Sequence, residues 1–185
     1  MAQVIEKPAS YEDLLGVPGN LVAEIIHGHL YTSPRPAPRH ARAASSLGAK
    51  INPPFDLGDN GPGGWWILDE PELHLDEDVF VPDLAGWRRE RMPQLPDTAW
   101  FELPPDWICE VLSPSTERID RAEKMPRYAH HGVKWLWLVD PDIKTLEAFE
   151  LHDGQWLLLE TLADDAMVRL PPFDAAEFPL SALWA

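Results

Sequence analysis

Two carboxylates in otherwise apolar surroundings are the residues of this sequence whose chemistry most needs explaining. Glu110 lies within the run Trp107–Leu112, in which all the other residues are apolar. An ionised carboxylate in a buried strand costs on the order of several kcal/mol unless a cation or hydrogen bonds compensate it. Asp83 follows Pro82, where we expect a strand to end and a loop to begin. Both acids therefore require a partner.

A hard divalent cation would satisfy two carboxylates at neighbouring strand ends. Mg²⁺, or Mn²⁺ in its place, usually takes one or two carboxylates and keeps waters and phosphate oxygens as its remaining ligands. Such an ion polarises a phosphate and lowers the pKa of an attacking water. The pair predicts a metal site with Asp83 and Glu110 as ligands, although a structural salt bridge explains either acid taken singly.

Lys124 is the cation that the sequence offers to these acids. It lies about two helical turns after Thr116, with Asp120 four residues before it and Tyr128 four residues after it. A continuous helix would place the three on one face, where the lysine could orient a water or stabilise charge on a phosphate. Pro126 predicts a kink or a new helix at this point. Without the acids, Lys124 would be an ordinary solvated helix charge.

Further polar side chains are candidates for contact with a substrate. We assign this role to His40, Ser113, Ser115 and Tyr128. A surface position on a helix explains His40 equally well. We expect the adjacent pair His130–His131 to lie at a helix C-terminus, where the helix dipole favours imidazolium, rather than to bind a metal.

The composition limits the class of protein and its partners. The 185 residues fit one domain, 1–185, and no apolar run approaches the ~20 residues that span a bilayer, so we expect a cytoplasmic protein. The net charge of −16 argues against tight binding to nucleic acid, which normally relies on Lys and Arg. The segment from Arg35 to Lys50, however, holds five basic groups and no acid, so the charge is uneven.

The pattern of apolar residues predicts a mixed α/β fold. The strands Trp107–Leu112 and Lys134–Val139 flank a helical segment, which is typical of a strand–helix–strand unit. Pro53–Pro54 is expected to close a helix over Arg39–Ile51. We expect a central mixed β-sheet flanked by helices, with an N-terminal and a C-terminal β-hairpin. The other predicted strands are Val22–His27, His29–Thr32, Trp65–Leu68, Pro71–Leu75, Val79–Val81, Thr145–Leu151 and Gln155–Thr161.

Several motifs occur in a definite order along the chain. They are Glu24–Leu30, Ser33–Pro34, His40, Val81–Asp83, Cys109–Thr116, Asp120, Lys124, Tyr128, Gly132 and Leu136–Pro141. This ordered set resembles the Uma-type putative restriction endonucleases, a family of the PD-(D/E)XK nuclease superfamily, over nearly the whole chain. The resemblance implies a restriction-endonuclease-like core and a divalent-metal-dependent endonuclease that hydrolyses phosphodiester bonds in DNA.

The resemblance also implies roles for individual residues. Asp83 and Glu110 match the family's metal ligands, and Glu24 matches an acidic residue upstream of them. Leu112 stands where the superfamily usually has a lysine, so Lys124 on the following helix takes that role. The implied catalytic set is therefore Asp83, Glu110, Lys124 and Glu24, with Mg²⁺ or Mn²⁺ as the cofactor.

Two other interpretations stay open at this point. The chain could keep a nuclease fold with little or no activity and bind proteins as an acidic module or DNA mimic. The net charge motivates this alternative, together with the acids Asp76, Glu77, Asp78, Asp164 and Asp165. In the other interpretation, a homodimer gathers the positive charge of two chains to hold a DNA duplex.

Overall fold

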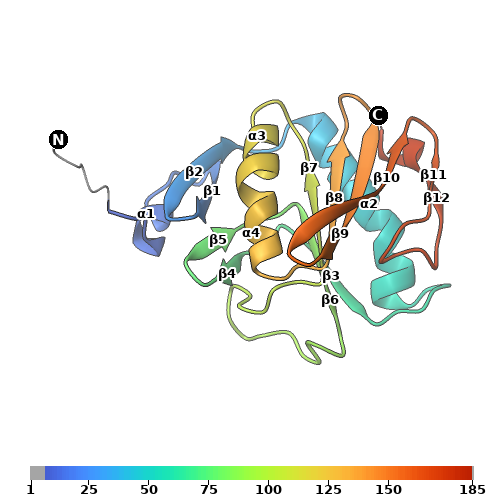
Figure 1. Cartoon of the computed structure of the whole chain (residues 1–185), viewed down its shortest axis with the longest axis horizontal. Helices are drawn as coiled ribbons and strands as arrows, with labels where there is room; N and C mark the ends of the chain where they lie inside the picture. Colours follow the sequence, from blue (N-terminus) through green and yellow to red (C-terminus); the bar gives the residue numbers. More distant parts are fainter. Residues whose placement is uncertain (1–6, 185) are drawn as a thin grey trace.

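Residues 7–184 are described by the computed structural model, and residues 1–6 and 185 of the predicted domain lie outside that description. The strands are β1 (Leu21–Ile26), β2 (His29–Pro34), β3 (Trp65–Asp69), β4 (Leu73–Leu75), β5 (Asp78–Phe80), β6 (Leu84–Arg88), β7 (Trp107–Val111), β8 (Trp135–Asp140), β9 (Thr145–His152), β10 (Gln155–Ala163), β11 (Met167–Val168) and β12 (Phe178–Pro179). A large sheet has the order β10-β9-β8-β7-β6-β3, in which β7 and β8 run parallel and the other neighbours antiparallel. A smaller antiparallel sheet has the order β2-β1-β5-β4 (Figure 1).

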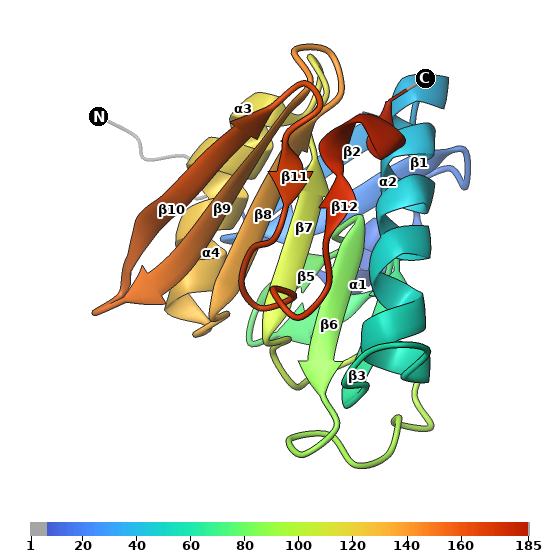
Figure 2. The same ribbon diagram turned by 90° about the vertical axis from the view of Figure 1, so that its right-hand side faces the viewer.

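Helices cover both faces of the large sheet. The helical segments are α1 (Tyr11–Leu15), which lies against β1 of the smaller sheet, α2 (Pro38–Ile51), η1 (Asn52–Leu57), α3 (Glu117–Ile119), η2 (Asp120–Lys124), α4 (Met125–His130) and η3 (Leu180–Leu183). Figure 2 shows α2 on one face and the run from α3 to α4 on the other. The predicted mixed sheet flanked by helices is confirmed, and so are the hairpins β1–β2 and β9–β10. Within residues 7–184, no helix combines the length and apolarity needed to cross a bilayer.

Two apolar cores form on the two faces of the large sheet. Trp107 and Val111 of β7 pack with α2 and the C-terminal segment on one face. Ile108 and Leu112 pack on the other face with α4 and residues of the smaller sheet. Successive side chains of a strand point to opposite faces, so a strand covered on both faces is apolar throughout. Glu110 has the same parity as Ile108, and its side chain therefore points toward the α4 face.

β5 ends at Phe80 and Asp83 lies in the connection that follows, as the sequence predicts, but this connection is short and the next strand, which the sequence does not predict, begins at once. β6 begins at Leu84 and lies between β3 and β7, so Asp83 precedes the strand next to that of Glu110. Gly86 at the centre of β6 makes the strand hard to predict from the sequence, because glycine is uncommon in strand interiors. Here the reason is space, since a Cβ on Gly86 would lie 3.3 Å from Cε3 atoms of two Trp rings.

Prolines end neither the helix formed by α2 and η1 nor the helix formed by α3, η2 and α4. The α-helix α2 ends at Ile51 as predicted, but Pro53–Pro54 lie inside the π-helical turn η1, which continues it. Pro126 likewise follows the π-helical turn η2, and the helix continues as α4. In an α-helix the proline ring clashes with the carbonyl four residues earlier. The wider π turn moves that carbonyl away and keeps Lys124 and Tyr128 on one continuous helix.

Replacement of Gly86 should destabilise the large sheet. The added side chain of Gly86→Val would meet the buried rings of Trp65 and Trp107, and overpacking of this kind costs about 1–3 kcal/mol. Gly19→Val is the matched control, because nothing lies within 4 Å of a Cβ there. Urea unfolding of both variants measures the difference, and equal free energies of unfolding would contradict the packing account.

Candidate active site

Lys124 is buried among three carboxylates from three parts of the chain. Its Nζ lies 2.9 Å from Glu24 Oε1 on β1, 3.2 Å from Glu110 Oε1 on β7 and 3.4 Å from Asp120 Oδ1 on its own helix. None of the four residues is more than 7% exposed. Buried charges are tolerated only when they are paired and hydrogen-bonded. This network therefore joins the smaller sheet, the large sheet and the helix at one point.

Two further hydrogen bonds hold the acids in position. The Tyr128 hydroxyl donates to Glu110 Oε1 at 2.5 Å, and the Val81 amide donates to Glu24 Oε1 at 2.8 Å. Tyr128 is fully buried and is not part of the cavity wall in front of Glu110. The structure thus places Tyr128 where it positions Glu110, and not at the surface where the sequence analysis expects contact with a substrate.

Asp83 lies beside Glu110 on the neighbouring strand. The antiparallel register of β6 and β7, continued by one residue, puts Asp83 opposite Glu110. Asp83 Oδ2 accepts a hydrogen bond from the Val111 amide at 2.7 Å and lies 3.4 Å from His40 Nε2 on α2. Burial would lower the pKa of His40, but the nearby Asp83 carboxylate outweighs burial, so the pKa of His40 is raised. His40 is therefore tied to the acid pair and is not a free surface side chain.

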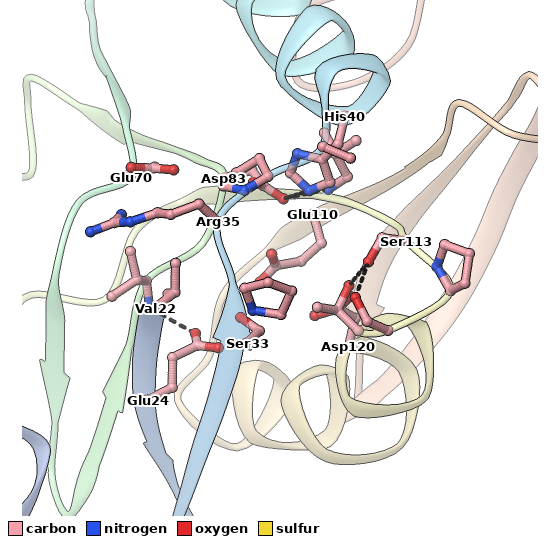
Figure 3. A pocket seen from close by; sticks show the side chains of 18 of the residues that line it. Val22, Glu24, Ser33, Arg35, His40, Glu70, Asp83, Glu110, Ser113 and Asp120 are labelled. Atoms are coloured by element: carbon pink, nitrogen blue, oxygen red, sulfur yellow. Dashed lines mark hydrogen bonds and ion pairs between the residues drawn. The ribbon is translucent and has the colours of Figure 1, made fainter. Parts of the chain in front are cut away.

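One cavity of about 260 Å³ brings these side chains together (Figure 3). Figure 3 shows Glu110 between Asp83 and Glu24, with His40 above it and Asp120 on the side away from Glu24. The cavity wall includes seven of the residues chosen from the sequence: Glu24, His40, Asp83, Glu110, Ser113, Ser115 and Lys124.

Burial and crowding raise the pKa values of the acids. The pKa of Glu110 lies well above its ordinary value, chiefly because burial disfavours the carboxylate; Lys124 opposes this and the nearby carboxylates add to it. Burial is also the main cause of the raised pKa values of Glu24 and Asp120. Burial would lower the pKa of Lys124, but the surrounding acids raise it well above its ordinary value. Lys124 is therefore a cation throughout the neutral range.

The donor set fits a hard divalent cation held by two carboxylates. Within residues 7–184, no protein hydrogen bond reaches Asp83 Oδ1 or Glu110 Oε2, which leaves one oxygen of each acid for another ligand. Four acidic side chains, Glu24, Asp83, Glu110 and Asp120, line the cavity, and a bound cation would stabilise their ionised forms. No three His, Cys, Asp or Glu ligand atoms of the described cavity wall lie within 4.8 Å of one another. Two protein ligands are also the number that Mg²⁺ usually takes.

Three charged residues of the described cavity wall are not among the site residues chosen from the sequence. The sequence places Asp120 on the helix face of Lys124 without giving it a role, and the structure puts it 3.4 Å from Lys124 Nζ. Arg35 and Glu70 also line the cavity and come from the segments that follow β2 and β3. Arg35 begins the basic segment noted in the sequence, whereas nothing in the local sequence distinguishes Glu70 from an ordinary loop charge.

Comparison with known proteins gives the chain a family. The model of the family Uma2, described as "Putative restriction endonuclease", matches residues 8–181. The chain belongs to the Uma2 family. The structure is also similar to the crystal structure of a putative nuclease belonging to DUF820 from Anabaena variabilis, with a TM-score of 0.76 and 22% sequence identity. That match covers 95% of this chain and 97% of the other, so the restriction-endonuclease-like fold expected from the sequence is confirmed. The search among curated proteins finds no match.

Loss of the Lys124 charge should destabilise this Uma2 protein in a pH-dependent way. Lys124→Met leaves buried carboxylates unpaired, which costs about 3–5 kcal/mol at neutral pH. Without Lys124 the raised pKa of Glu110 rises further. The cost is present above that folded-state pKa and is lost as the pH falls through it, because the acid then becomes neutral.

Urea unfolding at about pH 8 and about pH 5 measures this effect, since the ordinary pKa values of Glu and Lys lie outside that range. The deficit of Lys124→Met relative to the unchanged chain should be smaller at the lower pH. Lys50→Met is the control, because Lys50 is exposed on α2. A deficit equal at both pH values, or no larger than that of the control, would contradict the proposed charge network.

Proposed function

We propose that this chain is a divalent-metal-dependent endonuclease that hydrolyses phosphodiester bonds in DNA. The observation that carries the proposal is the meeting of Asp83, Glu110 and Lys124 in one cavity, with the two acids on adjacent strands. Membership of the Uma2 family, described as putative restriction endonuclease, supports it. The fold shared with a putative nuclease is consistent with the same reaction class.

The residues of the cavity can be given separate roles. Asp83 and Glu110 would hold Mg²⁺ or Mn²⁺, which when bound polarises the phosphate and lowers the pKa of the attacking water. Tyr128 fixes the orientation of Glu110 through its hydroxyl. Lys124 presents its ammonium beside Glu110, where it stabilises the charge that develops on the phosphate. Glu24 holds that ammonium at 2.9 Å and so sets its position.

The approach to the cavity carries groups suited to a phosphate backbone. Arg35 is an exposed residue of the cavity wall. The N-terminus of α2 also reaches this wall and has no side-chain cap, an arrangement that favours anions. A neighbouring groove shares His40 and Ser113 with the cavity and includes Arg39. Arg39 pairs with the half-exposed Asp142 at 3.6 Å, a weak contact that a phosphate can replace. These groups offer DNA a local path on an otherwise acidic protein.

Removal of either acid charge should abolish cleavage. Asp83→Asn and Glu110→Gln keep the side-chain shapes but remove a ligand charge, and we expect roughly 100-fold or greater loss, as for other electrostatic groups in active sites. Cleavage of supercoiled plasmid and of single-stranded DNA with Mg²⁺ or Mn²⁺ gives the measurement. The exposed acids Asp59 and Glu177 supply the matched controls Asp59→Asn and Glu177→Gln.

Equal cleavage by the unchanged chain and both acid variants would overturn the proposal. Calorimetric titration with Mn²⁺ distinguishes the proposed nuclease from the remaining alternative, an inactive acidic protein-binding module. The proposed site predicts heat of binding that Asp83→Asn removes and Asp59→Asn keeps. An acidic module without this site predicts no divalent-metal binding that depends on Asp83.

The cleavage rate should rise with pH in a metal-dependent way. Glu110 must lose its proton to bind a cation, and its pKa is raised, so the ionised ligand forms only above the ordinary glutamate range. A higher metal concentration stabilises the ionised form and should move the rise to lower pH. Initial rates across pH at two Mg²⁺ concentrations test this. A pH profile that does not move with metal concentration would contradict Glu110 as a ligand.

A further inference from the structure

A second group of potential metal ligands lies where the lysine-bearing helix ends. Asp76, in the turn between β4 and β5, lies against His130 and His131 at the end of α4. Each of the three offers one ligand atom, and these atoms all lie within 4.8 Å of one another. Figure 1 shows the end of α4 close to the β4–β5 hairpin. None of the three residues belongs to the wall of the candidate active-site cavity.

A buried carboxylate fixes the orientation of the His131 ring. His131 Nε2 lies 2.9 Å from Oδ2 of Asp78, which is fully buried. Asp78 also accepts hydrogen bonds from the His27 amide at 2.7 Å and from Arg127 Nε at 2.6 Å. Because the His27 amide and Arg127 also donate to Asp78, this carboxyl group acts as an acceptor, and we infer that the His131 ring donates to it from Nε2.

The other ring nitrogen of His131, Nδ1, faces Asp76. Nδ1 lies 3.6 Å from Asp76 Oδ2, too far for a hydrogen bond and in the range of two ligands that share one metal ion. Histidines that bind metals commonly donate their other ring hydrogen to a carboxylate, which fixes the tautomer and raises the basicity of the ligand. The Asp78–His131–Asp76 arrangement has this form. The chain also keeps Asp76 in position, because its backbone has a positive φ of 54° in a tight hairpin turn.

We propose that Asp76, His130 and His131 form a second metal site, which binds a transition-metal ion such as Zn²⁺. Two imidazoles and one carboxylate suit Zn²⁺, whereas Mg²⁺ prefers oxygen ligands alone. Water completes the coordination, because Asp76 and His130 are exposed. The site would clamp the β4–β5 turn to the end of α4, two residues beyond the Tyr128 that holds Glu110. It does not depend on the proposed nuclease activity.

Calorimetric titration with Zn²⁺ on the full chain, without any added histidine tag, tests the site. We expect the unchanged chain to bind Zn²⁺ at this site, and Asp76→Asn and His130→Ala each to weaken binding there at least about tenfold, the scale of lost second-shell or ligand contacts. Asn keeps the left-handed turn that Asp76 occupies. The exposed side chains of Asp165 and His152 supply the matched controls Asp165→Asn and His152→Ala.

Two further readouts make the result decisive. Zn²⁺ should raise the melting temperature of the unchanged chain and not that of His130→Ala, because a ligand that binds only the folded state stabilises it. A chain carrying both Asp83→Asn and Glu110→Gln should keep Zn²⁺ binding, which separates this site from the active-site proposal. Equal Zn²⁺ affinity in the unchanged chain and His130→Ala, or loss of binding in the doubly substituted chain, would overturn the inference.

Discussion

The ion pair between Glu110 and Lys124 is the contact on which the arrangement of this protein depends. Glu110 is fixed on a strand that is buried on both faces, so its carboxyl group is almost wholly removed from bulk water. Loss of one partner of such a pair costs about 3–5 kcal/mol, against about 0–1 kcal/mol for an exposed pair. The helix from α3 to α4 must therefore pack where Lys124 reaches Glu110. The smaller sheet is brought to the same point because it supplies Glu24.

The same contact explains why the site is suited to chemistry. Lys124 contacts Glu24, Glu110 and Asp120, and Asp83 lies beside His40, so four acidic side chains are gathered in one cavity. Burial is the main cause of the raised pKa values of Glu24, Glu110 and Asp120, and the neighbouring carboxyl groups add to it. Under the proposed function, a bound divalent cation would make this unfavourable feature a functional one.

Much of the site could be predicted from the sequence, because a charged residue inside an apolar segment is a local sign of a buried site. Glu110 interrupts an apolar strand, and that position alone demands a partner on the neighbouring elements. Lys124 rests mainly on the family resemblance, and its helix continues past Pro126 because a π turn accommodates the proline. Asp83 follows both from its place at the end of a strand and from the family pattern, although the sequence does not predict the strand that follows it.

The remaining features depend on tertiary contacts that local sequence does not encode. Gly86 weakens the strand signal of β6, and only the two Trp rings packed against it explain the residue. Tyr128 has the spacing of a surface helix residue, but the smaller sheet covers it and makes it a partner of Glu110. The pair His130–His131 fits a helix C-terminus in sequence. Its relation to Asp76 appears only when the β4–β5 turn is placed beside that helix.

The most direct test of the central claim is a crystal of the protein soaked in Mn²⁺, with anomalous scattering used to locate the ion. The account predicts a peak bonded to Asp83 and Glu110 at roughly 2.0–2.2 Å, the range for small hard cations and carboxylate oxygens, with Lys124 still within reach of Glu110. A cavity without an anomalous peak under saturating Mn²⁺ would contradict it. In that case the buried acids would be a structural network of Lys124 alone.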